Sequence, residues 1–110
     1  MKIILPLLFY IVSSIAITTW ANTNSQIPPQ RQQEILDLLK QDCGSCHGMT
    51  LKGGLGPSLK PDAIKKMSTE QIIATITYGR AGTPMPPWKP FFTQQEIRWL
   101  VQQLQQGIKD

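Results

Sequence analysis

Histidine and cysteine are scarce in this chain of 110 residues, which holds one histidine and two cysteines. A structural zinc site needs four Cys or His ligands, so these three residues cannot complete one. Aromatic residues make up only 7% of the chain, and the basic residues form no cluster larger than Lys65–Lys66. These two features exclude a nucleic-acid-binding surface. No segment has the pattern of a strand, and we therefore expect an all-α protein.

The three scarce residues fall within five positions, in the sequence Cys43-Gly44-Ser45-Cys46-His47. This spacing is that of a c-type haem attachment site. Two thiols three positions apart can each add across one haem vinyl group, and the adjacent imidazole then lies over the iron. A disulfide or a thioredoxin-like redox pair is the alternative, but no βαβ pattern surrounds the motif and the histidine would have no role. The motif predicts one covalent haem c, bound through Cys43 and Cys46, with His47 as an iron ligand.

The first 21 residues differ in composition from the rest of the chain. Lys2 gives a positively charged start, residues 3–17 are mostly apolar, and the segment ends at Ala21, a small residue such as a signal peptidase requires. The apolar run of about 15 residues is shorter than the about 20 residues of a membrane span, which disfavours an uncleaved anchor. We expect residues 1–21 to be a cleaved signal peptide, which would place the mature protein in the periplasm without stable membrane insertion.

Cleavage would leave 89 residues, which is enough for one domain. We expect a mobile leader over residues 22–30, which are polar and contain two prolines, and a monohaem domain over residues 31–110. The mature polypeptide would carry ten basic and seven acidic residues, a formal charge of +3. Domains of this size often depend on a bound metal or a cross-link, so a covalent haem would supply part of the core.

The spacing of apolar residues predicts three main helices, over residues 31–42, from Ser68 to Gly79 and from Thr93 onwards. The second and third begin with capping boxes, in which Gln71 pairs with Ser68 and Glu96 pairs with Thr93. Gly79 is suited to end the second helix in a left-handed conformation. A short helical turn is expected near Pro61.

The segment after the first helix is rich in glycine, which predicts neither regular helix nor strand from Gly44 to Gly56. A phosphate-binding loop is excluded because no GK[ST] sequence follows. The glycines are expected to let the backbone pass close to the haem. A ligating histidine is usually oriented by a hydrogen bond from its other ring nitrogen, and the carbonyl of Pro57 is our candidate acceptor. The alternative is that Pro57 only shapes a turn.

The second axial position of the iron decides between electron transfer and small-molecule binding. Met49 lies too close to His47 to reach the opposite face of a haem, which leaves Met67 and Met85. Met85 lies in the stretch Gly82–Trp88, whose three prolines make it stiff, so holding its sulfur on the iron costs little additional entropy. We favour Met85, with lysine as a further alternative. Two occupied axial positions predict a one-electron carrier and not an enzyme.

The haem motif, the tetrapeptide Gly56–Leu59 and a Met-Pro loop before the last helix resemble those of the class I c-type cytochromes. The resemblance covers the whole mature chain and implies a small fold in which the first and last helices cross. It also implies that Pro57 holds His47, that Met85 is the second axial ligand and that Leu59 belongs to the haem-binding residues. The first helix lacks the glycine and the aromatic residue that many members place at the crossing.

Residues 43–59 and 79–88 are similar to the cytochrome c55X subfamily, which is associated with cytochrome cd nitrite reductase in denitrifying bacteria. The resemblance implies electron donation to that enzyme or to the assembly of its d-type haem. The alternatives are a general periplasmic electron carrier, and a haem-binding assembly factor or sensor with a labile axial ligand. Four basic residues adjoin the expected haem edge, and they either steer the carrier towards an acidic partner or form only a solvated surface: Lys52, Lys60, Arg80 and Lys89.

Overall fold

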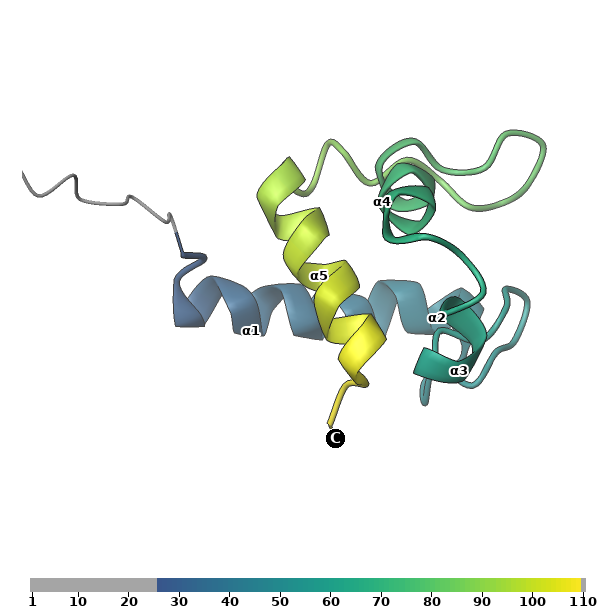
Figure 1. Ribbon diagram of the computed structural model, residues 1–110, viewed down its shortest axis with the longest axis horizontal. Helices are drawn as coiled ribbons and strands as arrows, with labels where there is room; N and C mark the ends of the chain where they lie inside the picture. The colour runs from purple at the N-terminus through teal and green to yellow at the C-terminus, as the bar shows by residue number, and fades with distance from the viewer. Residues whose placement is uncertain (1–25, 110) are drawn as a thin grey trace, which may run out of the picture.

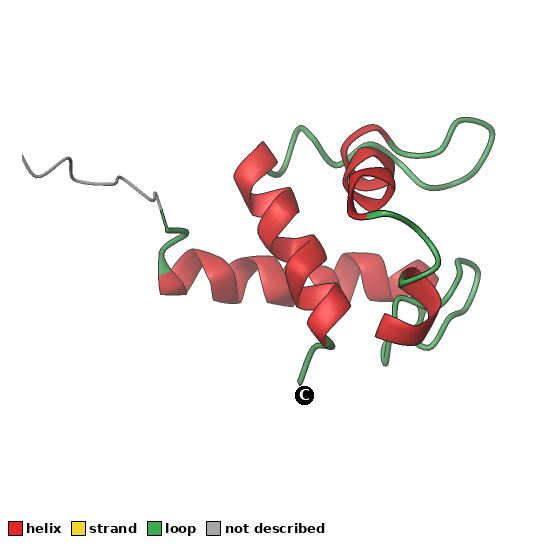
Figure 2. Ribbon diagram, in the orientation of Figure 1, coloured by secondary structure: helices red, strands yellow, loops and turns green. Residues whose placement is uncertain are grey.

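The computed structural model describes residues 26–109, which are helical and contain no strand (Figure 1, Figure 2). The elements are α1 (Pro29–Leu38), the π-helical segment η1 (Leu39–Cys43), α2 (Gly44–His47), α3 (Pro61–Ile64), α4 (Thr69–Tyr78) and α5 (Gln94–Gln106). The predicted all-α fold is confirmed. The predicted signal peptide and residues 22–25 of the predicted leader lie outside the described residues.

The first helix begins earlier than the predicted boundary at residue 31. It starts at Pro29, which suits the first helical turn because an N–H there would have no intrahelical partner. The preceding Ile27 is buried, and its carbonyl oxygen accepts a hydrogen bond of 2.8 Å from Gln32 Nε2. The first helix therefore includes Pro29 and Gln30, and the predicted boundary between leader and domain lies inside α1.

The haem motif is helical, contrary to the expectation that Gly44 lies outside regular structure. Gly44 has helical dihedral angles, with φ −62° and ψ −27°. A single glycine lowers helix stability by only about 1 kcal/mol relative to alanine, so it does not end a helix that packing supports. The π-helical segment η1 joins α1 to α2, and π-bulges within α-helices are frequent at functional sites. Cys43, Cys46 and His47 thus lie at the end of one continuous helical segment.

Both predicted capping boxes are present. Ser68 Oγ accepts a hydrogen bond of 3.1 Å from Gln71 N, and Gln71 Oε1 accepts one of 2.8 Å from Ser68 N. Thr93 and Glu96 form the same pair of bonds, of 3.2 and 2.8 Å, at the start of α5. Gly79 ends α4 as predicted, but with φ 70° and ψ −168° instead of the left-handed helical conformation. That region is essentially restricted to glycine.

The core lies where α5 crosses the first helical segment (Figure 1). The side chains at its centre are almost completely buried and aliphatic: Ile35 and Leu39 from the first segment, and Ile97, Leu100 and Val101 from α5. Burying each contributes about 1.5–3 kcal/mol. The crossing therefore forms with branched aliphatic residues in place of the glycine and aromatic residue that are missing from the first helix.

A hydrogen-bonded ion pair joins the beginnings of α1 and α5. Arg31 Nε donates to Glu96 Oε1 at 2.7 Å, and Arg31 Nη2 donates to Glu96 Oε2 at 3.3 Å and to the carbonyl oxygen of Phe91 at 3.2 Å. The Glu96 side chain is only 12% exposed. The hydrogen bond from Arg31 lowers the pKa of Glu96, and the same bond raises the pKa of Arg31. The pair fixes the N-terminal end of α5 against α1.

The remaining helix, α3, is short and packs against α5. It begins at Pro61, as predicted. Over residues 26–109, no helix combines the length and the apolar character needed to cross a lipid bilayer.

Candidate haem-binding site

His47 is buried at the C-terminal end of α2, with 8% of its surface exposed. Its Nδ1 lies 2.6 Å from the carbonyl oxygen of Pro57, which is the contact predicted from the sequence. Because a carbonyl oxygen can only accept, the ring proton of the neutral imidazole belongs on Nδ1. Nε2 then keeps its lone pair and can ligate a metal, while the hydrogen bond fixes the ring orientation.

A glycine lies against the face of this imidazole ring. A Cβ atom at Gly56 would lie 2.8 Å from both Cε1 and Nδ1 of His47, closer than any ordinary contact. The loop that carries Gly56 is fixed by backbone hydrogen bonds, of 2.8 Å from Gly53 N to the carbonyl of His47 and of 2.8 Å from Gly56 N to the carbonyl of Cys46. The glycines of this loop therefore allow the backbone to approach Cys46 and His47 closely.

An apolar cavity of about 720 Å³ opens beside the motif. Its volume lies within the range of about 300–1,000 Å³ that is usual for cofactor sites. The structure brings all the predicted site residues to its walls: Cys43, Cys46, His47, Pro57, Leu59 and Met85. These residues come from η1, α2 and two separate loops, and the cavity is where they meet.

Both cysteines are free thiols that line this cavity. Cys43 is half-buried, whereas Cys46 is exposed. Burial raises the pKa of the Cys43 thiol to about 11, and the neighbouring charge of Asp42 acts in the same direction. The two sulfur atoms are thus available for bonds to a ligand in the cavity and are not joined to each other.

The two candidate methionines both line the cavity, but they are held differently. Met67 is 40% exposed. Met85 is half-buried, and its carbonyl oxygen accepts a hydrogen bond of 3.2 Å from Arg80 N. The loop is also joined to α4 by a bond of 2.9 Å from Trp88 N to the carbonyl of Ile76. Met49 is 69% exposed and does not line the cavity.

Three charged residues border the cavity, namely Asp42, Lys66 and Arg80. Of the four basic residues that the sequence placed near the haem edge, only Arg80 lines it. Lys66 was not identified from the sequence. Its place just before the capping box of α4 gave no signal beyond its charge.

Several apolar wall residues were also not identified as site residues. They are Ile64, Ile72, Ile76, Trp88, Phe92, Leu100 and Leu104. The helical spacing of the isoleucines and leucines predicts that they are buried in the core. It does not indicate that some of them line a cavity. For Trp88 the available signal was an aromatic residue directly after the Met85 loop.

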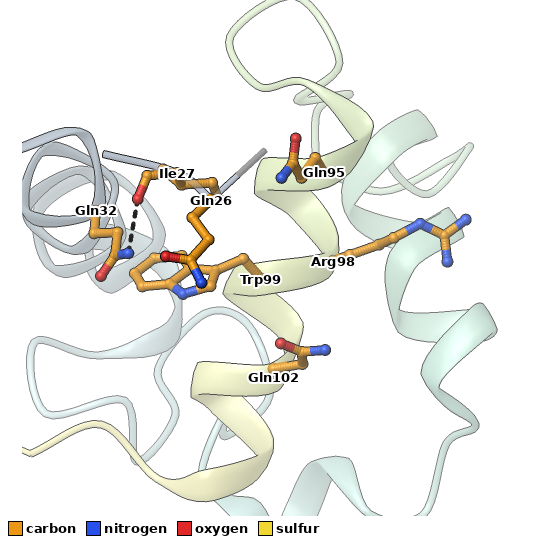
Figure 3. Close-up of a pocket in the computed structure, with 7 residues that line it drawn as sticks. All are labelled: Gln26, Ile27, Gln32, Gln95, Arg98, Trp99 and Gln102. Carbon is orange, nitrogen blue, oxygen red and sulfur yellow. Dashed lines mark hydrogen bonds between the residues drawn. The ribbon is translucent and has the colours of Figure 1, made fainter. Parts of the chain in front are cut away.

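A second hollow, of about 540 Å³, lies between the start of the described chain and α5 (Figure 3). Four glutamine amides, Ile27, Arg98 and Trp99 line it. Trp99 falls outside the apolar stripe of the last helix, and the hollow is where its half-buried ring lies. The walls of this hollow offer no sulfur or imidazole, so of these two cavities within residues 26–109 only the first has the groups expected of a haem site.

The residues of the first cavity fit a covalently attached haem. They offer two thiols, an imidazole nitrogen with a lone pair and a thioether, and the remaining walls are largely apolar. This is the donor set that c-type haems use.

Comparison with known proteins agrees with this chemistry. A family model described as "Cytochrome C oxidase, cbb3-type, subunit III" matches residues 20–103. The chain is 47% identical over 78 residues to cytochrome c55X of Pseudomonas aeruginosa, covering 71% of this chain and 66% of that one. It is also 47% identical over 81 residues to cytochrome c55X of Stutzerimonas stutzeri, covering 73% and 72%. The chain belongs to the cytochrome c55X family of c-type cytochromes.

Solved structures show the same relationship for the fold. The chain matches a c-type cytochrome NirC with a TM-score of 0.72 and 45% identity, covering 74% of this chain and 96% of that one. It also matches dihydro-heme d1 dehydrogenase NirN in complex with DHE, with a TM-score of 0.62 and 29% identity. That match covers 68% of this chain and only 16% of NirN. This c55X relative therefore has the small all-α cytochrome c fold, which also occurs as one part of a larger protein.

Proposed function

We propose that this c55X relative is a periplasmic monohaem cytochrome that transfers single electrons, to cytochrome cd nitrite reductase or to the assembly of its d-type haem. One observation carries the proposal. The cavity joins two thiols, the lone pair of His47 and the thioether of Met85, while Pro57 fixes the histidine from behind. No other part of residues 26–109 combines these groups.

Each group has a role in this proposal. Cys43 and Cys46 would hold one haem through thioether bonds, and His47 and Met85 would ligate its iron. When bound, the haem supplies a one-electron couple between ferric and ferrous iron. Because both axial positions would be occupied by protein ligands, no position remains for a substrate, and we infer a carrier and not an enzyme.

The chain's own residues suit such a carrier. Pro57 keeps the His47 ring in one orientation. The hydrogen bond from Trp88 N to Ile76 joins the Met85 loop to α4, and the bond from Arg80 N to the Met85 carbonyl closes the loop on itself. A site held this way moves little when its charge changes, which keeps the barrier to electron exchange low. The apolar walls keep water from the ligands, and thioether ligation further favours the ferrous state.

The partner and the location rest on the resemblance to relatives and on the N-terminal sequence. The c55X relatives match over most of this chain, and the subfamily is associated with cytochrome cd nitrite reductase. The predicted signal peptide and the assembly of c-type haems outside the inner membrane both favour the periplasm. A general carrier that serves several oxidases and reductases is the related alternative.

A role in haem assembly is favoured by a specific observation. The chain resembles part of a protein named dihydro-heme d1 dehydrogenase, so a related cytochrome domain occurs in a protein that acts on a d1-type haem precursor. In that role the cytochrome would exchange electrons with an assembly enzyme, or bind the tetrapyrrole itself as cargo. These possibilities differ in what binds to the purified protein.

The proposed function is tested with the holoprotein and purified cytochrome cd nitrite reductase. We expect the reduced holoprotein to reduce the oxidised enzyme in a second-order reaction, followed by stopped-flow absorbance. An enzyme that stays oxidised would contradict electron donation to the reductase and leave the assembly role, and reduction of several unrelated oxidases at equal rates would favour the general carrier.

Two binding measurements separate the remaining alternatives. Rapid binding of carbon monoxide to the ferrous protein at neutral pH would indicate a labile axial ligand and hence a sensor. Tight binding of the d-type tetrapyrrole in a titration would indicate a cargo role. We expect neither, because in this proposal Met85 would ligate the iron and a covalent haem would fill the cavity.

A further inference from the structure

An aromatic contact leads from the cavity to the surface. Trp88 and Phe92 line the cavity, and their ring centroids lie 5.9 Å apart with the rings nearly stacked. The Trp88 ring also contacts the ring of Phe91, at a centroid distance of 5.6 Å. Phe91 does not line the cavity and is 63% exposed. One side chain, that of Trp88, thus separates the cavity from an exposed aromatic ring.

Phe91 is held outwards by a fixed turn. Phe91 N donates a hydrogen bond of 2.9 Å to the carbonyl oxygen of Trp88. The carbonyl oxygen of Phe91 accepts a hydrogen bond from Arg31 Nη2, which also donates to Glu96. The neighbouring Phe92 is buried and anchors the turn in the core. An exposed aromatic ring on a rigid backbone has little conformational entropy to lose on binding, a property that favours interface contacts.

The charges around this ring favour an anionic contact. Lys89 Nζ lies 5.5 Å from the ring centroid of Tyr78, which is 67% exposed. Among residues 26–109 no carboxylate forms an ion pair with Lys89. The nearby carboxylates of Glu34 and Glu96 are both engaged by Arg31. Lys89 precedes Phe91 by only two residues. The Phe91 face, which we define as Tyr78, Lys89 and Phe91, therefore combines two exposed aromatic side chains with one unpaired positive charge.

We propose that the Phe91 face is the docking site for a protein redox partner that presents an apolar contact beside a carboxylate. The inference rests on the proposed electron-transfer function. Trp88 gives the reason for a redox partner, because a protein seated on Phe91 is separated from the cavity by that one aromatic side chain. Phe91 supplies the apolar anchor, and Lys89 supplies the charge that orients the partner.

The test compares two exposed apolar side chains that are both truncated to alanine. Phe91→Ala removes the anchor, and Met49→Ala removes a residue that is 69% exposed, directly follows the haem motif and does not line the cavity. The reduced holoproteins are mixed with cytochrome cd nitrite reductase, and the second-order rate constant is measured at low and high ionic strength. Reduction potentials of all variants are measured, so that a change in driving force is recognised.

We expect Phe91→Ala to lower the rate constant at least about tenfold, as for a central aromatic interface residue, with an unchanged potential. Met49→Ala should stay within about twofold of wild type. Lys89→Gln should slow the reaction at 0.01 M salt and have little effect at 0.15 M, where the Debye length has fallen from about 30 to about 8 Å.

A rate that falls as much or more in Met49→Ala would place docking beside the haem motif and overturn the inference. So would a wild-type dimer that Phe91→Ala converts to a monomer in sedimentation, or binding to anionic vesicles that Phe91→Ala abolishes. A wild-type protein that transfers no electron to the enzyme would refute the proposed electron donation to the reductase, and this inference with it. Active wild type with an equally active Phe91→Ala variant would refute this inference alone.

Discussion

Gly79→Ala should disturb the position of Met85 more than it disturbs the rest of the fold. Gly79 ends α4, and a Cβ atom there would lie 2.6 Å from the carbonyl oxygen of Met85, 2.8 Å from Pro86 C and 2.9 Å from Pro87 N. All three are backbone atoms, so no side-chain rotation can relieve the contacts. The Met85 loop must therefore move away from α4.

The size of the effect follows from these distances and from a matched control. Restoring an ordinary contact of 3.4 Å requires a shift of about 0.8 Å at the Met85 carbonyl. Gly82, in the same loop, also has a positive φ, of 75°, but a Cβ there would meet no atom within 4 Å. Gly82→Ala thus carries backbone strain alone, about 1–2 kcal/mol. Gly79→Ala adds the displacement of the loop, and we expect it to cost at least about 1 kcal/mol more.

Three measurements on the oxidised and reduced holoproteins test this prediction. Gly79→Ala should lose the weak sulfur-to-iron charge-transfer band and bind carbon monoxide when reduced, whereas Gly82→Ala should keep the band. Denaturant unfolding measures the two free-energy costs. An intact band in Gly79→Ala, or equal loss of the band in both variants, would show that Gly79 does not position the ligand.

Three further predictions concern the ligand, the fold and the histidine. Met85→Ala should abolish the charge-transfer band and Met67→Leu should retain it; the opposite pattern would assign the ligand to Met67. Glu96→Gln should lower the free energy of unfolding by about 1–2 kcal/mol at pH 7. The pKa of Glu96 is lower in the folded protein than its unfolded pKa of about 4.3. Its contribution to the free energy of unfolding is therefore present above about pH 4.3 and is lost as the pH falls through the folded pKa. An equal loss of stability in Glu96→Gln at pH 7 and at pH 3 would contradict this. Gly56→Ala should displace the His47 ring from its acceptor and raise the reduction potential, and an unchanged potential in a redox titration would exclude that role.

The main helices could be predicted because their signals are local. The capping boxes that begin α4 and α5 use residues three positions apart, and the apolar stripes need only the helical period. The start of α1 could not be placed in the same way. Pro28 and Pro29 indicate a loop when they are considered alone, but Pro29 fits the first turn of a helix, and the burial of Ile27 depends on contacts with distant residues. The helical conformation of Gly44 also depends on packing.

The parts of the candidate site that depend on residues close together in the sequence could be predicted. The Cys43–His47 motif is contiguous, and the contact of Pro57 with His47 follows from the general need to orient a ligating histidine. The walls of the cavity were not predictable, because they form only when α4, α5 and the Met85 loop come together. Gly79 shows the difference clearly: the sequence marks it as the end of a helix, and only the fold reveals its contact with the Met85 backbone.

The two proposed iron ligands are held by unequal constraints. His47 lies at the end of a continuous helical segment, is buried and is fixed by Pro57. Met85 lies in a mostly exposed loop that is joined to the end of α4 by a few backbone hydrogen bonds. Local opening occurs most readily where few contacts must break, so the Met85 loop should open at a lower free energy than the histidine side. Opening would leave the haem attached through Cys43 and Cys46, with the iron ligated by His47 and open to a small molecule. If Met85 is the second iron ligand, we therefore expect the free energy of opening that loop to decide between electron transfer and gas binding.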